Sequence, residues 1–262
     1  MSSKNWILLK ELVKTDFKLR YQGSLMGHLW SILKPLMLFG VMYVVFVQFL
    51  GFGRDMPHFA VALLLGMVIW TFFAETTSMG LMSIVARGDL LRKLNFPKEI
   101  IVLSVEVSAF INFLINLLVV LFFGIINHVE ISKYAVFAPL YIIPLFALSL
   151  GFAFILATMF VYFRDIAPVW EVVMQAGMYA TPIIYSLSMI HNKTIKAVMM
   201  LNPLATMIQD LRHLLIYHGN QVIGDFIHTK WIIAIPYVLP FVILLIGYTI
   251  FKKNADRFAE II

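Results

Sequence analysis

The sequence of 262 residues contains no cysteine, which excludes disulfides, thiolate catalysis and cysteine-ligated metal sites. It also lacks a G-x-x-x-x-G-K-[ST] run, the loop whose backbone N–H groups hold nucleotide phosphates, so we expect this chain not to hydrolyse ATP by itself. The first 34 residues have no short apolar segment followed by a small-residue cleavage site. We therefore expect the first apolar run to act as an uncleaved targeting signal.

Charged residues are scarce as well. They make up 13% of the chain while hydrophobic residues make up 61%, whereas soluble domains have about 25% and about 45–50%. This composition predicts an integral membrane protein. The net charge of +6 arises from basic residues that flank apolar runs, so anionic lipid headgroups are expected partners and nucleic acid is not.

Six long apolar runs are present. They cover residues 35–53, 59–86, 100–127, 134–163, 172–190 and 231–251. A helix of about 20 apolar residues crosses a bilayer. The predicted fold is therefore an all-α membrane protein with six transmembrane helices.

The basic residues are distributed unevenly around these runs. With the amino terminus inside, fourteen of the twenty Lys and Arg residues lie in the cytoplasm: Lys4, Lys10, Lys14, Lys18, Arg20, Lys34, Arg87, Arg92, Lys93, Lys98, Arg164, Lys252, Lys253 and Arg257. The remaining six are Arg54, Lys133, Lys193, Lys196, Arg212 and Lys230. The positive-inside rule then predicts that both termini are cytoplasmic.

Residues 4–20 have an apolar and a basic side on a helical wheel. This pattern predicts an amphipathic helix lying on the inner leaflet, although a simple basic anchor would also fit. Asp16 and Arg20 are four residues apart, a spacing at which they can pair.

The loop after the second run is patterned. Asp89 can cap a short helix that Pro97 prevents from continuing, and Leu90, Leu91 and Leu94 give it an apolar face. Apolar residues on the wet side of a membrane favour docking of a protein partner, while an ordinary loop is the alternative. The brief turn at residues 163–168 could form a second, smaller contact.

Residues 188–230 form a long segment outside, interrupted at Asn202 and Pro203 and followed by an amphipathic stretch at 204–217. Its apolar pieces are too short to span, so we expect them to re-enter the outer leaflet or to lie along it. An outer lid and a surface connector are both compatible with this pattern.

Few residues suggest catalysis. His213 and His218 are five residues apart, which places them on different faces of a helix and argues against a metal site. Glu75 and Glu106 lie within runs, where charge is costly. One interpretation is that the two carboxylates line a polar path or a subunit contact. The other, which we favour, is that each hydrogen-bonds within the bundle, with Asn112 and Asn116 as candidate partners.

Several strings, in order along the whole chain, resemble those of permease subunits of ATP-binding-cassette exporters for polysaccharides and teichoic acids. They are YQGSLMGHLWSILKPL at residues 21–36, LNFPKEI at 94–100, YFRDI at 162–166, TPIIY at 181–185, LNPL at 201–204 and RFAE at 257–260.

The resemblance implies a single permease domain over 1–262 in a bacterial cytoplasmic (inner) membrane. Its parts would be an interfacial helix in 1–30, spans one to five in 31–187, an outer gate in 188–230, span six at 231–251 and a cytoplasmic tail at 252–262. It also implies a second copy of the chain, two copies of a separate ATPase that holds ATP and Mg, and a lipid-linked glycan or polyol-phosphate substrate.

The resemblance also suggests roles for particular residues. For ATPase coupling they are Asp89, Leu90, Leu91, Arg92, Leu94, Phe96, Pro97, Arg164 and Asp165; for the substrate headgroup, Arg20 and Lys34; for an aromatic pathway, Phe39, Tyr43, Tyr179 and Tyr185; for the outer gate, Asn202, Pro203 and Arg212. Membrane-belt or packing roles remain the alternative for the aromatic residues.

A drug or small-molecule permease of the same exporter class is the next hypothesis. A self-sufficient secondary carrier would show paired broken spans in two related halves, which the sequence does not display. A membrane-bound enzyme is also disfavoured, because neither H-E-x-x-H nor G-x-S-x-G occurs.

Overall fold

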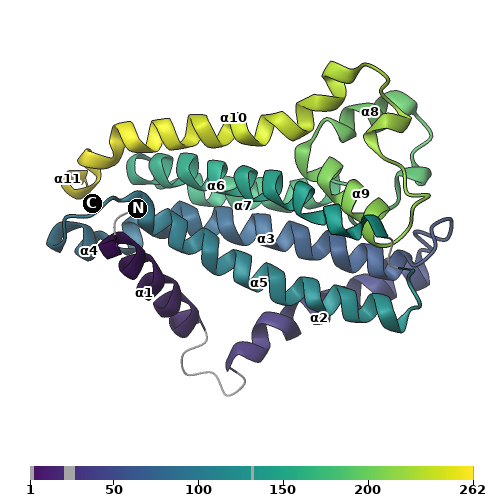
Figure 1. Cartoon of the computed structure of the whole chain (residues 1–262), viewed down its shortest axis with the longest axis horizontal. Helices are drawn as coiled ribbons and strands as arrows, with labels where there is room; N and C mark the ends of the chain where they lie inside the picture. Colours follow the sequence, from purple (N-terminus) through teal and green to yellow (C-terminus); the bar gives the residue numbers. More distant parts are fainter. Residues whose placement is uncertain (1–2, 21–26, 131–132, 262) are drawn as a thin grey trace.

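The computed structural model describes residues 3–20, 27–130 and 133–261, which form helices and no strand (Figure 1). The α-helices are α1 (Ser3–Arg20), α2 (Trp30–Met42), α3 (Phe59–Ala86), α4 (Gly88–Lys93), α5 (Glu99–Ile126), α6 (Ala138–Tyr162), α7 (Ile166–Ala180), α8 (Lys193–Met200), α9 (Pro203–Leu215), α10 (Lys230–Asn254) and α11 (Phe258–Ile261). A π-helical segment, η2 (Tyr43–Phe49), continues α2. The 3-10 turns are η1 (Gly27–Leu29), η3 (Lys133–Phe137), η4 (Leu187–Met189), η5 (Ile223–Asp225) and η6 (Ala255–Arg257).

Five of the described helical segments are long and apolar enough to cross a membrane: Trp30–Phe49, Phe59–Ala86, Glu99–Ile126, Lys133–Tyr162 and Lys230–Ile261. They correspond to the first four and the last of the predicted spans. The helices α3 and α5 each contain 28 residues, about 42 Å at the helical rise. This exceeds the ~30 Å hydrocarbon core, so both helices have room to tilt or to project beyond it.

The predicted fifth span, residues 172–190, is not one continuous helix. In its place α7 has 15 residues, begins at Ile166 and ends at Ala180, which gives about 22 Å. Pro182 disfavours a helical conformation at Thr181, and Thr181 is extended with φ −95° and ψ 136°. The chain turns there, and η4 follows.

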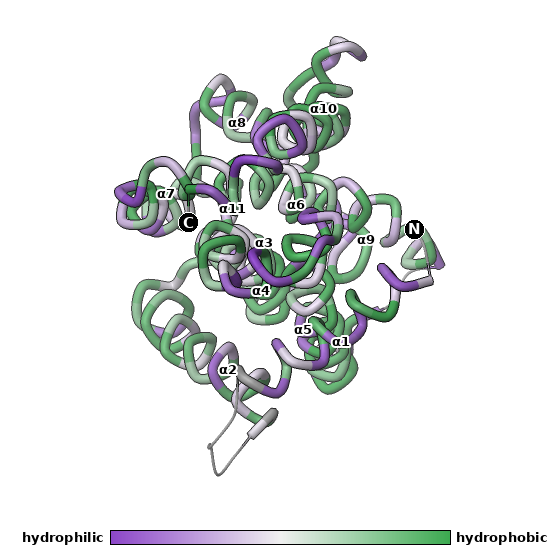
Figure 2. The backbone as a smooth tube through the Cα atoms, turned by 90° about the vertical axis from the view of Figure 1, so that its left-hand side faces the viewer, coloured by the Kyte–Doolittle hydropathy of each residue, from purple (hydrophilic) through white to green (hydrophobic). Residues whose placement is uncertain are grey.

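The helix α3 lies at the centre of the bundle, with α5, α6 and α7 around it (Figure 2). Nearly every side chain from Phe59 to Phe73 is buried, and the apolar residues of α3 contribute more than any other element to the main core. In contrast, α2 exposes large apolar side chains, among them Met37, Leu38 and Val41. The outer face of α2 therefore suits lipid or another protein chain.

Two glycines allow α6 and α10 to approach closely. A Cβ atom at Gly247 would lie 2.4 Å from the carbonyl oxygen of Gly151, and one at Gly151 would lie 2.7 Å from the backbone N of Leu244. Both obstacles are backbone atoms, so they cannot rotate away. The contact requires a hydrogen in place of a side chain at both positions.

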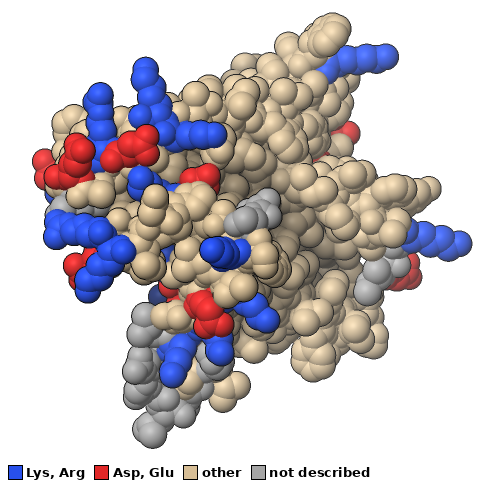
Figure 3. Space-filling model, turned by 60° about the vertical axis from the view of Figure 1, so that its left-hand side comes forward, with Lys and Arg blue, Asp and Glu red and all other residues tan. Residues whose placement is uncertain are grey.

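The charged residues gather at one end of the bundle, which we call the basic end and define by α4, α11 and both described termini (Figures 1 and 3). Lys and Arg side chains crowd this end, while the middle of the visible face is almost free of charge (Figure 3). The grouping of basic residues predicted from the sequence therefore corresponds to a grouping in space. The helices α8 and α9 lie at the opposite end (Figure 1).

The helix α9 is buried, which contradicts the surface-connector alternative for residues 204–217. From Pro203 to Arg212 every residue of α9 is buried, and the helix packs against α3, α6 and α10. Its polar side is therefore turned into protein. The break predicted at Asn202 and Pro203 is confirmed, because the Asn202 side chain caps α9 by accepting from the Leu204 N–H at 3.1 Å.

Candidate functional site

A groove of about 1080 Å³ opens between α1, α2, α3 and α5, with Met178 of α7 at its edge. Its lining combines apolar and polar side chains: Asp16, Trp30, Ser31, Lys34, Pro35, Leu38, Met67, Trp70, Thr71, Ala74, Glu75, Ser78, Met79, Asn112, Asn116 and Met178. A groove of this composition suits an amphipathic or multiply hydroxylated ligand.

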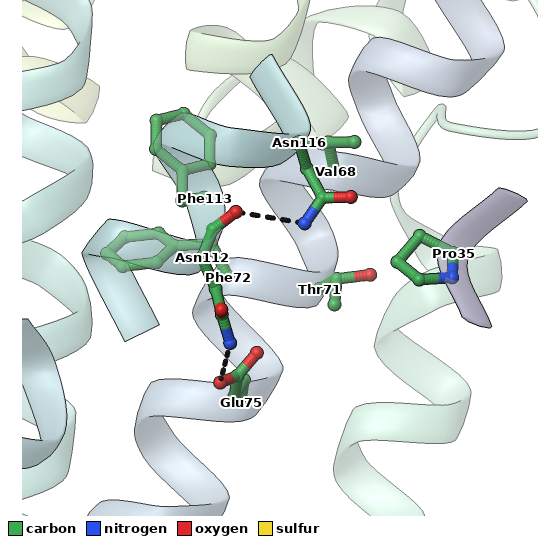
Figure 4. A pocket seen from close by; sticks show the side chains of 8 residues that line it. All are labelled: Pro35, Val68, Thr71, Phe72, Glu75, Asn112, Phe113 and Asn116. Atoms are coloured by element: carbon green, nitrogen blue, oxygen red, sulfur yellow. Dashed lines mark hydrogen bonds between the residues drawn. The ribbon is translucent and has the colours of Figure 1, made fainter. Parts of the chain in front are cut away.

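The floor of the groove is a small hydrogen-bonded set on α3 and α5 (Figure 4). Asn112 Nδ2 donates to Glu75 Oε1 at 3.1 Å, and Asn116 Nδ2 donates to the Asn112 carbonyl oxygen at 2.9 Å. The predicted pairing of Glu75 with Asn112 is thus confirmed. Asn112 Oδ1 is buried without a hydrogen-bond partner among the described residues.

Glu106 hydrogen-bonds within the bundle, as predicted, but its partner is a serine and neither of the two candidate asparagines. Glu106 is fully buried, and its Oε1 accepts from Ser149 Oγ of α6 at 2.7 Å. The helix α5 turns Glu106 toward α6 and Asn112 toward the groove. Glu106 therefore contacts Ser149, and Asn112 contacts Glu75.

The mouth of the groove carries charges. Lys34 is exposed there, whereas the side chain of Arg20 lies outside the described residues. Asp16 forms an ion pair with Arg87, a partner 71 positions further along the chain, while the predicted pairing of Asp16 with Arg20 falls on a side chain outside the described ones and stays a prediction.

None of the four predicted pathway aromatics lines the groove. Phe39 packs against Phe123 with ring centroids 6.2 Å apart. Tyr43 accepts a hydrogen bond from Gln48, and Tyr185 donates to the Tyr179 carbonyl at 3.0 Å.

Two tryptophans, Trp30 and Trp70, do line the groove, and neither is among the four predicted pathway aromatics. One sequence signal could have located the groove. Polar residues recur at helical spacing within two apolar runs, at Thr71, Glu75 and Ser78 on α3 and at Asn112 and Asn116 on α5.

The short helix α4 exposes fewer predicted coupling residues than expected. Leu91 is buried, with 6% of its surface exposed, and packs in a core with Phe251 and Phe258. Leu94 is 52% exposed. Asp89 lies in the first turn, and Arg87 holds the N-cap position with no side-chain hydrogen bond to the first turn of α4, so the predicted Asp89 cap is wrong.

The other coupling candidates divide by exposure. Those on the surface are Asp89, Arg92, Pro97, Arg164 and Asp165, and those partly buried are Leu90 and Phe96. The turn between α6 and α7 is brief, as predicted, and Arg164 lies 4.9 Å from the centre of the Phe160 ring.

Arg212 is fully buried and binds three backbone carbonyls. Its Nε donates to Ala62 O at 3.0 Å, and Nη1 and Nη2 donate to Pro182 O and Ile183 O at 2.8 and 2.7 Å. In the described part of the chain no carboxylate pairs with it. Burial lowers the pKa of Arg212 to about 9, so the guanidinium is charged at neutral pH and joins α9 to α3 and to the break after α7.

Asp210, also on α9, accepts a hydrogen bond from the Tyr237 hydroxyl of α10 at 2.5 Å. Burial raises the pKa of Asp210 to about 6, and the Tyr237 hydrogen bond lowers it by less. This pKa lies above the usual value of 3.8. Between pH 3.8 and about pH 6, Asp210 therefore binds a proton more strongly in the folded state than in the unfolded chain.

Stability should therefore increase as pH falls from about 7 toward about 4, by up to about 3 kcal/mol from this group. We expect Asp210→Asn, whose amide oxygen can still accept from Tyr237, to remove this increase while other titrating groups contribute equally to both proteins. Thermal unfolding at pH 7, 6 and 5 measures the difference. Parallel pH profiles for the two proteins would contradict the prediction.

The side chains of His213 and His218 meet, contrary to the expectation from their spacing. Their ring centroids are 5.6 Å apart, because α9 ends at Leu215 and the chain then turns back. Groups of three or more His, Cys, Asp or Glu suited to a metal ion do not occur within the described ranges.

Long apolar helices around a groove with a polar floor are typical of a multi-pass membrane protein. Residues 7–216 match the family model described as ABC-2 type transporter, and the chain belongs to this family. It is 30% identical over 260 residues to an O-antigen export system permease protein RfbA of Klebsiella pneumoniae, covering 97% of this chain and 95% of the relative.

A second RfbA of Klebsiella pneumoniae is 29% identical, covering 97% of this chain and 95% of that protein. One of Myxococcus xanthus is 28% identical, with coverages of 97% and 94%. The resemblance to a type-2 export permease noted from the sequence strings is thus confirmed over nearly the full length.

Proposed function

We propose that this chain is the transmembrane permease of an ATP-driven exporter that moves a polysaccharide or teichoic acid on a polyprenyl pyrophosphate across the inner membrane. The observation that carries the proposal is the similarity over 97% of the chain to proteins named as O-antigen export permeases. Because the sequence lacks a phosphate-binding loop, ATP and Mg would be held by a separate ATPase, two copies of which would serve two copies of this chain.

The groove supports this substrate class. A glycan presents many hydroxyls, which the Glu75 carboxylate and the Asn112 and Asn116 amides can bind, and the Trp30 and Trp70 side chains offer flat surfaces for sugar rings. Lys34 at the mouth would attract the pyrophosphate, together with Arg20. The groove is open at its edge, and a second copy of the chain would complete the pathway.

The basic end would be cytoplasmic, with both termini inside, by the positive-inside rule. The ATPase would then dock on α4 and on the turn containing Arg164 and Asp165. At the other end, residues 188–230 with Asn202, Pro203 and Arg212 would form the outer gate. The helix α7 and the turn after it would complete a sixth, broken passage through the membrane.

The proposal is tested by purifying the chain with the ATPase encoded beside it. We expect a stable complex, and we expect Leu94→Asp to reduce association and ATP-driven export at least tenfold, because a charge would replace an exposed apolar contact. Leu94→Met is the matched control and should retain both. Leu91→Asp should instead lower folding yield, because Leu91 is buried. Export by the wild-type chain without any ATPase would reject the proposal.

A further inference from the structure

We propose that the ion pair between Asp16 and Arg87 is a mechanical link that makes α1 and α4 move as one body, so that movement of α4 changes the width of the groove. Asp16 and Arg87 are thus positioning residues that couple the ATPase-facing loop to the substrate groove. This inference rests on the proposed function, since it assumes that a partner moves α4.

The ion pair is part of a cluster that joins three helices. Arg87 donates through Nη2 to Asp16 Oδ1, and through Nη1 to Ser104 Oγ at 2.9 Å and to the Ile101 carbonyl at 3.3 Å. Ser104 Oγ in turn lies 3.4 Å from Asp16 Oδ2. Only 18% and 11% of the Arg87 and Asp16 side chains are exposed, so water screens the pair less than a surface pair.

On one side, the link reaches the groove. Asp16, near the end of α1, lines the groove, as does Lys34. The helix α1 rests on α5, and in Figure 1 it runs away from α4 toward α2 and the open side of the bundle. A displacement of α1 therefore changes the opening between α1 and α2.

On the other side, the link reaches α4. Arg87 is the cap residue at the start of α4, and its carbonyl accepts from the N–H groups of Leu90 and Leu91. A push on the exposed surface of α4 must therefore move the Arg87 backbone. The bond to Asp16 carries that movement to α1, and the bonds to Ser104 and Ile101 set the pivot on α5.

The chain contains a matched pair that lacks these features. Lys98 and Asp256 form an ion pair at 3.4 Å, also at the basic end, but Asp256 is 99% exposed and neither residue lines the groove. Breaking this pair removes an ion pair of the same type without affecting the link between α4 and the groove.

The test compares charge reversals in the complex with the ATPase reconstituted in lipid vesicles. We expect Asp16→Arg and Arg87→Asp each to lower export at least tenfold while the complex still assembles and hydrolyses ATP. The double variant Asp16→Arg/Arg87→Asp should regain at least a third of wild-type export. The matched exchange, Lys98→Asp/Asp256→Lys, and its single variants should transport like the wild type.

A second measurement uses the absence of cysteine. In a chain with both Asp16→Cys and Arg87→Cys, a short bifunctional thiol reagent should restore export to the otherwise uncoupled protein, because the tether replaces the ion pair. A chain with only one of these two substitutions should stay uncoupled when treated with the same reagent.

The outcomes separate the two proposals. Normal export by both single reversals would overturn the link. So would complexes that assemble but regain export neither in the double reversal nor in the tethered double-cysteine chain. Failure of the wild-type chain to bind an ATPase would instead overturn the proposed function.

Discussion

Replacing Arg212 by Met should be among the most damaging substitutions in this chain. The change removes three hydrogen bonds from a charged donor to the buried carbonyl oxygens of Ala62, Pro182 and Ile183, of which Pro182 O keeps a second donor, Gln209 Nε2 at 3.1 Å. Hydrogen bonds to a charged group contribute about 1.5–3 kcal/mol each, so we expect a loss of about 3 kcal/mol or more. A decrease of about 6–12 °C in the apparent melting temperature follows, measurable by thermal unfolding in detergent or lipid discs.

Two variants make this prediction specific. Arg212→Lys should recover little stability, because a single ammonium cannot reach three carbonyls on different segments. Arg54→Met removes an exposed arginine and should leave the melting temperature unchanged within about 2 °C, since surface substitutions have small effects. An Arg212→Met protein as stable as the wild type would show that the guanidinium does not hold α9 to the break after α7.

Enlarging Gly247 or Gly151 should separate α6 from α10. Even alanine at Gly247 places its Cβ 2.4 Å from a backbone oxygen of Gly151, and alanine at Gly151 meets the backbone of Leu244 at 2.7 Å. Since backbone atoms cannot change rotamer, the helices must shift, at a cost of about 1–3 kcal/mol for overpacking. Leucine at either position should prevent accumulation of folded protein, as measured by yield and by gel filtration.

The matched control is Gly40 in α2, where an added Cβ would have no neighbour within 4 Å. Alanine there should be neutral or stabilising by up to about 1 kcal/mol, because alanine favours a helix more than glycine does. If alanine raises stability at Gly40 and lowers it at Gly247, the effect at Gly247 comes from packing and not from helix propensity. Gly247→Leu protein with normal yield and melting temperature would contradict the close contact.

Much of the fold could be predicted because bilayer length and apolar composition leave few alternatives. The runs at 59–86 and 231–251 correspond to α3 and α10 with small changes at their ends. The fifth run failed as a continuous span, because composition does not reveal that Pro182 and Thr181 end α7 early. The predicted lid segment holds α9, whose amphipathic pattern resembles that of a surface helix although the structure buries its polar side too.

The site was less accessible to sequence reasoning. The Glu75–Asn112 bond could be anticipated because both groups are polar residues in apolar runs, which must find partners. The tryptophans of the groove were hidden among many aromatics, and Leu91 looked like a docking residue because its burial depends on α11, far along the chain. Asp16 has Arg20 as a local candidate partner, while its ion pair in the fold is with Arg87.

The sequence by itself determined that this protein lies in a membrane, which end of its helices is basic and that it cannot hold ATP in a phosphate-binding loop, because composition and local motifs suffice for each. Only the tertiary structure decided that the polar stripes of α3 and α5 form a groove, that Arg212 binds carbonyls of two other segments and that Asp16 reaches α4. These contacts join residues far apart in the chain, and their partners are set by helix packing, which no local pattern specifies.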